Sequence, residues 1–351
     1  MKGEMNCAVF HGVEDMRMER RPIPSCPKGG LLVKVKACGI CGGDVRNYHN
    51  RLKDGVTNQI IGHEIAGEVV EVGSNVTRFK VGEAVAMAPD VSCGNCWYCR
   101  RGLVNLCESH KMLGTHFPGG YAQYIALPPQ VLEHGFVEPI PQGMKWEHAA
   151  FAETAAAVVA CQKRIGIGMG DSVLIIGDGP VGCLHVEVAR ARGAAKIMVV
   201  GMDRLSLAQS FKPDLLLDNR NPETVAASVM EATDQIGADF VICAVPTTAV
   251  QQQAIHLCRK RGTVVIYGGV PKTADISTLS SNRIHYAEIT VTGAFSYPAT
   301  GLQDALSAIH TGQIHADAYI SQIIPLSHVL EGMEMVRKGI ALKVILDPWQ
   351  E

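Results

Sequence analysis

The sequence predicts an α/β protein in which a β-rich part precedes a doubly wound parallel sheet. Residues 5–90 form short strand-like runs separated by glycines, without the period of a long helix. From residue 171 onward, apolar strand-like runs alternate with helical segments, which is typical of βαβ units. The chain has 351 residues, and single cores stop growing at about 250–300 residues, so we expect two domains.

The composition restricts the classes of partner. The formal net charge is −2, which gives no basic field for nucleic acid or for an anionic membrane surface. No run approaches the ~18 apolar residues of a membrane span, and the first residues carry no apolar secretory segment, so we expect a cytoplasmic protein. Charged residues make up only 19% of the chain, below the usual ~25%. This low charged fraction favours a homodimer or homotetramer that buries part of the surface.

Three stretches of the first part have the pattern of strands. Leu31–Ala37 alternates between two faces, and Glu64–Val72 and Glu83–Ala88 are apolar runs next to glycines. The glycines that follow these runs predict tight turns. We therefore expect consecutive strands of one β-rich domain.

Four of the twelve cysteines crowd into fifteen residues. They are Cys93, Cys96, Cys99 and Cys107. Thiolates separated by two residues can point to one side of a tight loop, and a fourth thiolate then completes a tetrahedron around zinc. Four sulfur ligands leave no open position, so we predict a structural zinc in a lobe at about residues 90–110. An iron–sulfur cluster also takes four cysteines, but this spacing differs from the common ferredoxin runs.

A second group of metal-binding residue types lies closer to the N-terminus. His63 and Glu64 stand side by side in an apolar, glycine-rich stretch, and Cys41 precedes His63 by twenty-two residues. Cys, His and Glu together suit zinc, and three protein ligands leave a fourth position open for chemistry. A hydrogen-bonded polar pair inside a strand is the alternative interpretation of His63 and Glu64.

The pattern of the sequence changes from strand-like to helical at Trp146–Gly166, which is rich in alanine. Glu153 stands in an apolar setting within this predicted helix. Its carboxylate is either a first-turn side chain or a metal ligand contributed from the junction of the two domains.

A glycine-rich loop follows the apolar strand predicted at Ser172–Ile176. The loop is Gly177-Asp178-Gly179-Pro180-Val181-Gly182. A helix is predicted after it, to about Arg192, and then a strand at Ile197–Val200. In such a βαβ unit the glycines permit a tight turn and a close approach of a pyrophosphate to the helix N-terminus. Proline is tolerated in the first helical turn. We therefore predict a dinucleotide-binding loop.

The alternation continues to the end of the chain. Strands are predicted at Asp239–Cys243, Thr263–Tyr267, Glu288–Gly293 and Ala341–Leu346, and helices at Thr248–Lys260, 301–312 and 326–338. The last of these strands is expected to return to the first domain.

These ordered motifs resemble those of the zinc-dependent medium-chain dehydrogenase/reductase family over nearly the whole chain. The sequence is most similar to the branch of sorbitol and other polyol dehydrogenases and L-threonine 3-dehydrogenase, because Glu153 falls where the alcohol dehydrogenases proper have a cysteine. The resemblance implies a GroES-like catalytic domain at 1–150, a Rossmann nicotinamide-binding domain at 151–290, and a return to the catalytic domain at 291–351. It places the substrate cleft between the two domains.

The resemblance also implies two zinc ions per chain and a reaction. Cys41, His63 and Glu153 would bind the catalytic zinc directly or through water, and Glu64 would be an adjacent or exchanging ligand. The metal lowers the pKa of a bound alcohol, and hydride then passes to the nicotinamide of NAD(H) or NADP(H). The implied substrate is a small secondary alcohol, most simply a polyol or sugar.

Two positions depart from the pattern of this family. Polyol and alcohol dehydrogenases usually carry Ser or Thr two residues after the ligand cysteine, and often His five residues after it. Here these positions are Gly43 and Arg46. Glycine has no hydroxyl, and arginine is no base in the usual pH range, so the standard proton path is absent. We expect the proton to leave through water, a carboxylate (Glu64 or Glu153) or His49. Arg46 is either a contact to a polyhydroxylated or acidic substrate, or a surface or cofactor-phosphate contact.

The choice between the two cofactors is open in the sequence. NAD enzymes place an acid at the end of the second strand, where it binds the ribose hydroxyls. That position is Gly201, and Arg204 close by is compatible with the 2′-phosphate of NADP. Asp203, however, can still reach a ribose hydroxyl, and the branch that the chain resembles favours NAD.

Two other functions compete with polyol oxidation. The first is an L-threonine 3-dehydrogenase-like activity, against which Arg46 counts, because that branch relies on the histidine relay. The second is a nucleotide-binding sensor or structural protein without catalysis. The complete set of Cys41, His63, Glu64 and Glu153 argues against it.

Overall fold

The computed structural model describes residues 2–351, so Met1, the first residue of the predicted catalytic domain, lies outside the described residues. The chain divides into two compact units. The first comprises the residues up to Ala157 together with Tyr297–Glu351, and the second comprises Val158–Ser296. Helix α3 (Trp146–Ile165) contains the boundary between them.

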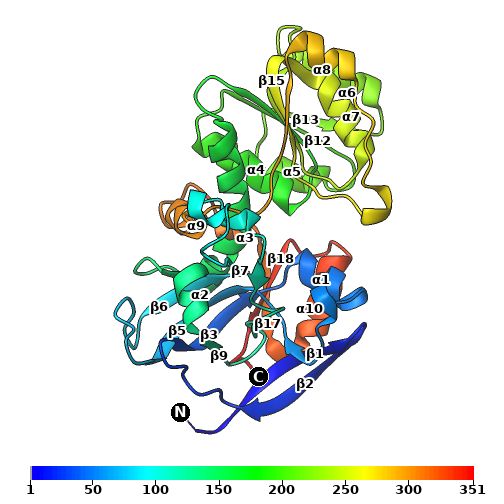
Figure 1. The fold of residues 1–351 in the computed structure, drawn as a ribbon. Helices are drawn as coiled ribbons and strands as arrows, with labels where there is room; N and C mark the ends of the chain where they lie inside the picture. The colour runs from blue at the N-terminus through cyan, green and yellow to red at the C-terminus, as the bar shows by residue number, and fades with distance from the viewer. Residues whose placement is uncertain (1) are drawn as a thin grey trace. The chain divides into compact units, whose positions relative to one another are not determined.

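The first unit is built mainly from β-strands (Figure 1). Its strands are β1 (Glu4–Gly12), β2 (Asp15–Pro22), β3 (Leu31–Gly39), β4 (Gln59–Ile60), β5 (Glu64–Val72), β6 (Ala84–Ala88), β7 (Asp90–Val91), β8 (Lys111–Met112), β9 (Tyr124–Leu127), β10 (Phe136–Pro139), β17 (Ile320–Pro325) and β18 (Lys343–Asp347). The larger sheet has the order β10-β6-β5-β3-β18-β17, with β9 also pairing with β3, and the smaller sheet has the order β2-β1-β4. Strands β7 and β8 form a separate pair. The expected β-rich domain is therefore present.

Short helices complete the first unit. They are α1 (Gly42–His49), α2 (Pro129–His134), α9 (Gly301–His310) and α10 (Val329–Arg337), with 3₁₀ turns at η1 (Lys53–Gly55), η2 (Cys99–Arg101), η3 (Val104–Leu106), η5 (Ala316–Ala318) and η6 (Leu326–His328). Helices α1 and α10 lie side by side (Figure 1). The hydrophobic core of the unit includes residues of both sheets, and β3 contributes Leu31, Val33 and Val35, all fully buried.

The last strand of the chain lies in the larger sheet of the first unit. Strand β18 runs antiparallel to β3 and pairs Ile345 with Gly39 and Leu346 with Cys38. This pairing brings the last strand of the chain next to the strand that ends just before Cys41.

The second unit is a parallel six-stranded sheet with the order β13-β12-β11-β14-β15-β16. Its strands are β11 (Ser172–Ile176), β12 (Lys196–Gly201), β13 (Leu215–Asp218), β14 (Ala238–Cys243), β15 (Cys258–Ile266) and β16 (Thr290–Gly293), and its helices are α4 (Pro180–Ala191), α5 (Leu205–Ser210), α6 (Pro222–Ala232), α7 (Thr248–Leu257) and α8 (Ser281–Ala287), with a 3₁₀ turn η4 (Lys272–Ala274). This order is that of a dinucleotide-binding Rossmann fold. Helices α6, α7 and α8 gather on one side of the sheet (Figure 1). The predicted α/β fold class is confirmed.

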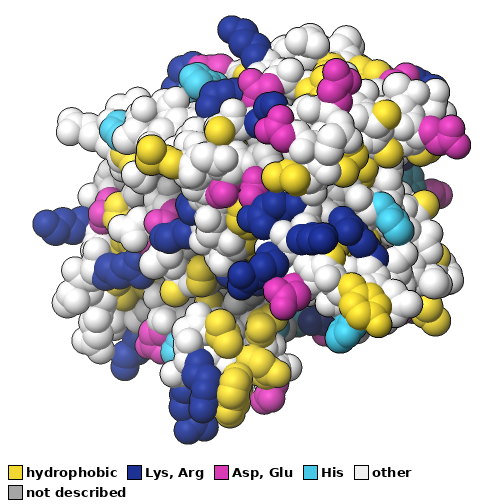
Figure 2. Space-filling model, turned by 90° about the horizontal axis from the view of Figure 1, so that it is seen from above, with side chains coloured by type: hydrophobic (Ala, Val, Ile, Leu, Met, Phe, Trp, Pro, Cys, Tyr) yellow, Lys and Arg dark blue, Asp and Glu magenta, His cyan; other side chains and the backbone are white. Residues whose placement is uncertain are grey.

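The charge distribution agrees with the small net charge. Figure 2 shows one face of the molecule, on which several Lys and Arg side chains gather near the middle, while Asp and Glu side chains and hydrophobic side chains are scattered around them. Among the described residues, no helix is both long enough and apolar enough to cross a membrane.

Candidate metal centre and nucleotide-binding loop

Cys41 stands between strand β3 and helix α1, and it is the N-cap residue of this helix. Its backbone and side chain cap the helix, because the Sγ atom accepts a hydrogen bond from the Gly43 N–H at 3.3 Å. The Asp44 carboxylate reaches back and accepts from the Cys41 N–H at 3.1 Å. This reciprocal arrangement is a capping box with a thiol in place of the usual hydroxyl.

His63 is oriented by the same carboxylate. Its Nδ1 atom donates to Oδ1 of Asp44 at 3.1 Å, and the hydroxyl of Tyr121 donates to Oδ2 of Asp44 at 2.9 Å. Burial opposes a charge on His63, but Asp44 outweighs it and raises the pKa of the imidazole well above its usual range. In the neutral ring that binds a metal, a Nδ1–H group held in this way leaves the other ring nitrogen as the ligand.

A glycine is required immediately before His63. Gly62 has a φ of 88°, and a Cβ atom placed on it would lie 2.2 Å from the ring of Tyr121. Only glycine lets the backbone pass so close to this tyrosine, whose hydroxyl in turn donates to Asp44. The glycine before His63 thus allows the backbone to take the path that positions the imidazole.

Glu64 is buried at the start of β5 and forms an ion pair with a residue near the end of the chain. Nζ of Lys343 lies 2.5 Å from Oε1 and 2.7 Å from Oε2 of Glu64, and the hydroxyl of Thr154 donates to Oε1 at 3.0 Å. Burial lowers the pKa of Lys343, but Glu64 outweighs this effect, so that the pKa is raised. The carboxylate of Glu64 is therefore held by β18 and α3.

The structure brings three of the four predicted ligands of the catalytic metal together. One donor atom from each of Cys41, His63 and Glu64 lies within 4.8 Å of the others. Glu153 stands outside this group, and the hydroxyl of Tyr297 donates to its Oε1 at 2.9 Å. Burial raises the pKa of Glu153 to about 7.

The two unusual positions lie on helix α1. Gly43 contributes its backbone N–H to the Cys41 thiol, and Arg46 is exposed. His49, an expected alternative in the proton path, is also exposed, and its Nδ1 atom lies 2.9 Å from a carboxylate oxygen of Glu14.

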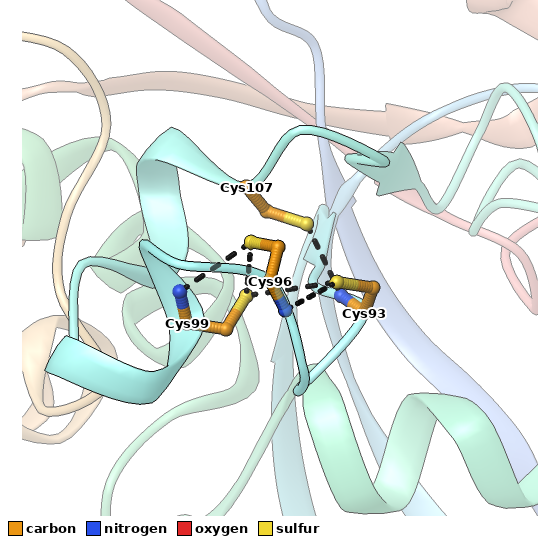
Figure 3. A group of neighbouring side chains, drawn as sticks. All are labelled: Cys93, Cys96, Cys99 and Cys107. Atoms are coloured by element: carbon orange, nitrogen blue, oxygen red, sulfur yellow. Dashed lines mark hydrogen bonds between the residues drawn. The ribbon is translucent and has the colours of Figure 1, made fainter.

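The four-cysteine lobe forms a second donor group (Figure 3). The sulfur of Cys99 lies 3.4 Å from that of Cys96 and 4.0 Å from that of Cys93, and the Cys93 N–H donates to the sulfur of Cys107 at 3.2 Å. Donor atoms of all four lie within 4.8 Å of one another. Backbone N–H groups lower the pKa of Cys96 to about 6, whereas burial raises the pKa of Cys107 to about 12. All four thiols are free.

The glycine loop joins β11 to α4 as predicted. A Cβ atom on Gly182 would lie 1.9 Å from the carbonyl oxygen of Gly177, so only glycine permits this close packing of helix on loop. Pro180 begins α4 after Gly179, with Val181 in the same first turn. A cavity of about 380 Å³ opens at this loop. It is lined by Asp178, Gly179, Pro180, Val181, Gly182, Asp203, Arg204, Ala244, Val245 and Pro246.

Sequence reasoning missed several residues that position the site. Asp44 carried a usable signal, because an acid three residues after Cys41 fits a capping box. Lys343 and Tyr121 gave none, since each reaches the site from a distant part of the chain. Asp178 was visible only as one residue of the glycine loop.

Comparison with known proteins agrees with this geometry. Residues 27–141 match the model of the alcohol dehydrogenase GroES-like domain, and residues 180–311 match that of the zinc-binding dehydrogenase. A sorbitol dehydrogenase of Bombyx mori is 32% identical over 98% of both chains. An erythritol/L-threitol dehydrogenase of Mycolicibacterium smegmatis is 30% identical over 98% of both chains. The chain therefore belongs to the zinc-binding alcohol dehydrogenase family.

Solved structures give the same result. A 2R,3R-butanediol dehydrogenase from Bacillus subtilis has a TM-score of 0.88 at 27% identity and covers 98% of this chain and 99% of its own. A zinc-binding dehydrogenase from Sinorhizobium meliloti 1021, bound to NADP, has a TM-score of 0.88 at 29% identity and covers 99% and 100%. The predictions of a zinc-dependent oxidoreductase and of a nicotinamide cofactor are confirmed. The non-catalytic alternative receives no support from these relatives.

Proposed function

We propose that this chain oxidises a secondary hydroxyl group of a polyol or sugar, with a nicotinamide dinucleotide as hydride acceptor, and reduces the corresponding ketone in the reverse direction. The observation that carries the proposal is the convergence of Cys41, His63 and Glu64 within 4.8 Å. The relatives named for sorbitol and for erythritol or L-threitol support the substrate class.

We propose Cys41 and His63 as direct zinc ligands, with Glu64 or Glu153 as the carboxylate that completes the set. A thiolate, an imidazole and a carboxylate form a donor set that zinc prefers, and three protein ligands leave a position for substrate. Bound zinc supplies Lewis-acid polarisation of the substrate oxygen. The four thiols of Cys93, Cys96, Cys99 and Cys107 would hold the structural zinc.

The residues around the site have defined tasks in this proposal. Asp44 fixes the ring of His63 through Nδ1, and Tyr121 fixes Asp44. Lys343 compensates the charge of Glu64 and keeps the carboxylate directed toward β18. These contacts preorganise the donor atoms, and such outer partners are typically needed for full metal affinity.

The proton of the substrate hydroxyl has no side-chain hydroxyl to pass through at position 43. The guanidinium of Arg46 has only donor groups and accepts no hydrogen bond. We infer that the proton reaches solvent through water or through one of the two carboxylates, Glu64 and Glu153. The variant Gly43→Ser tests this inference, because a hydroxyl that joins the path changes the pH profile of kcat, and an unchanged rate and profile show that no relay is missing.

The location and assembly state are part of the same proposal. All twelve cysteines are free thiols, which fits a reducing compartment, and we propose a cytoplasmic enzyme.

The exposed apolar side chains of Trp97, Leu103 and Leu106 on the four-cysteine lobe support a homodimer or homotetramer. Light scattering after gel filtration measures the assembly state. A monomer at micromolar concentration would rule out a homodimer or homotetramer.

A substrate panel tests the proposed function directly. Polyols, sugars, simple secondary alcohols and L-threonine are each incubated with the zinc-loaded enzyme and either NAD or NADP, and absorbance of the reduced nicotinamide is followed. We expect the highest kcat/KM with a polyol or sugar. A clear preference for L-threonine would favour the alternative activity, and no turnover with any hydroxyl compound would overturn the proposal.

A further inference from the structure

Two carboxylates belong to the candidate metal centre, and different partners hold them. The Glu64 carboxylate contacts the ammonium group of Lys343, and one of its oxygen atoms lies in the three-residue donor group. The Glu153 carboxylate lies outside this group, and its Oε1 atom accepts a hydrogen bond from the hydroxyl of Tyr297 at 2.9 Å. The contact that holds Glu153 therefore comes from a neutral hydroxyl group.

Glu153 nevertheless lies close to the donor group. The next residue of α3, Thr154, donates from its hydroxyl to Oε1 of Glu64 at 3.0 Å and accepts from Nζ of Lys343 at 3.0 Å. Glu153 is partly exposed, and a glutamate side chain has several rotatable bonds. Without a fixed partner, its carboxylate would be free to turn toward the metal.

The side chain of Tyr297 is fixed by its packing. It is only 2% exposed, and its ring packs edge to face against Phe136 with 5.1 Å between the ring centroids. Helix α9 begins close beside it, because a Cβ atom on Gly301 would lie 2.4 Å from Cβ of Tyr297. A buried tyrosine hydroxyl normally needs a hydrogen-bond partner, and here Glu153 is that partner. The tyrosine thus supplies a fixed donor to a side chain that has the freedom to rotate.

The segment that supports Tyr297 also supports the four-cysteine lobe. Phe136 is the first residue of β10, which pairs with β6. Two residues before it, the backbone carbonyl of His134 accepts from the N–H of Ser92 at 3.0 Å and from the Ser92 hydroxyl at 3.2 Å. Ser92 directly precedes Cys93, the first cysteine of the lobe. The aromatic partner of Tyr297 therefore belongs to the region of the first unit against which the lobe packs.

We propose that Tyr297 is a positioning residue of the site. Its hydroxyl holds Glu153 beside the donor group and keeps this carboxylate from becoming a fourth protein ligand. Three protein ligands leave a position for the substrate oxygen, whereas a fourth would close the site, as in the four-cysteine lobe. The inference rests on the proposed function in taking Cys41, His63 and Glu64 as the residues that bind the zinc.

The variant Tyr297→Phe tests the proposal, because it removes the hydroxyl and retains the ring that packs against Phe136. Zinc release from the purified full chain to a chromogenic chelator is followed, and the phase that is missing in Cys41→Ala is assigned to this site. We expect this phase to be about 10-fold slower in Tyr297→Phe than in the wild type, because Glu153 can then bind the metal. Loss of a merely structural contact would accelerate the release instead.

Imidazole reports on the open position in a second measurement. It binds a metal through a ring nitrogen, and cobalt(II) in place of zinc gives a visible spectrum that changes with the ligands. Imidazole should shift the spectrum of the cobalt-substituted wild type, and Tyr297→Phe should need an about 10-fold higher concentration for the same shift. An equal requirement in the two proteins would contradict the proposal.

Two further variants make the test specific. The double variant Tyr297→Phe, Glu153→Gln removes the carboxylate, so its rate of zinc release should return to within about 3-fold of the wild-type rate. Tyr319→Phe is the matched control and should leave the rate unchanged, because Tyr319 is also buried in the first unit and its ring stacks on Phe151. Release from Tyr297→Phe as fast as from the wild type, or slow release that persists in the double variant, would overturn the proposal. Absence of polyol turnover would contradict the proposed function but would leave these metal measurements interpretable.

Discussion

The ammonium group of Lys343 and the carboxylate of Glu64 are in direct contact, with Nζ 2.5 Å from Oε1 and 2.7 Å from Oε2. Lys343 is 6% exposed and Glu64 is fully buried. A buried carboxylate beside a metal-binding group requires a fixed partner, and the last strand of the chain provides it. The last strand therefore supplies both an edge-to-edge pairing with β3 in the sheet and the ion-pair partner of Glu64.

Removing the ammonium group should destabilise the protein. Lys343→Met removes the ammonium partner of the buried Glu64 carboxylate, and breaking a buried pair in this way costs about 3–5 kcal/mol in the free energy of unfolding. Urea unfolding of the zinc-loaded protein measures it. The double variant Lys343→Met, Glu64→Gln should recover much of the loss, because no uncompensated charge remains. A single variant as stable as the wild type would show that Lys343 is not needed as a partner.

The hydrogen bond from His63 to Asp44 should matter for zinc affinity. Asp44→Asn keeps the size of the side chain and removes its charge, so zinc affinity or turnover should fall by about 10-fold to 100-fold. Competition with a chromogenic chelator measures the affinity. Asp54→Asn is the matched control, since Asp54 is an exposed acid that also contacts a histidine, His116, at 3.1 Å. Equal effects of the two substitutions would contradict the orienting task of Asp44.

The four-cysteine lobe should hold one zinc independently of the candidate catalytic site. Cys99→Ser removes one of four thiolates, and we expect the zinc content to fall by one equivalent and the lobe to become sensitive to proteases. Cys26→Ser, at a half-buried thiol outside both donor groups, should change neither quantity. Metal analysis and limited proteolysis are the measurements. An unchanged zinc content in Cys99→Ser would contradict the predicted site.

His185 should make the protein sensitive to acid. Its Nε2 atom has no hydrogen-bond partner among the described residues, and burial lowers the pKa of the imidazole to about 3. The unfolded chain takes up this proton near pH 6.5, so the stability that the neutral ring allows is complete above that pH and is lost as the pH falls toward 3. At pH 5 the loss is about 2 kcal/mol.

The variant His185→Leu should lack this loss. The difference in unfolding free energy between wild type and variant should therefore shift by about 2 kcal/mol between neutral pH and pH 5 in favour of the variant. His256→Leu, at an exposed imidazole, should not show the shift. Parallel pH dependence of the wild type and His185→Leu would contradict the assigned pKa.

Local patterns allowed much of the fold to be predicted from the sequence. The alternation of strands and helices predicted the parallel sheet, and the spacing of Cys93, Cys96, Cys99 and Cys107 predicted a donor group that the structure brings together. Both signals lie within short stretches, where spacing along the chain determines spacing in space.

The supporting contacts of the site could not be predicted in the same way. Lys343 and Glu64 are 279 positions apart in sequence, and the pairings of β18 with β3 and of β3 with β5 bring them together. The partner of Asp178 is the backbone of Met202 and Arg204, which leaves no trace in residue types. Residue spacing predicted a metal centre and a nucleotide loop, and tertiary packing determined how both are held.

The most direct test of the account combines zinc content with polyol-dependent reduction of the nicotinamide cofactor in the wild type and in Cys41→Ala. We expect two equivalents of zinc per wild-type chain and one in the variant, with polyol turnover reduced at least ~100-fold, because the polarised substrate oxygen requires the metal. Two equivalents of zinc in Cys41→Ala, or turnover equal to that of the wild type, would contradict the account.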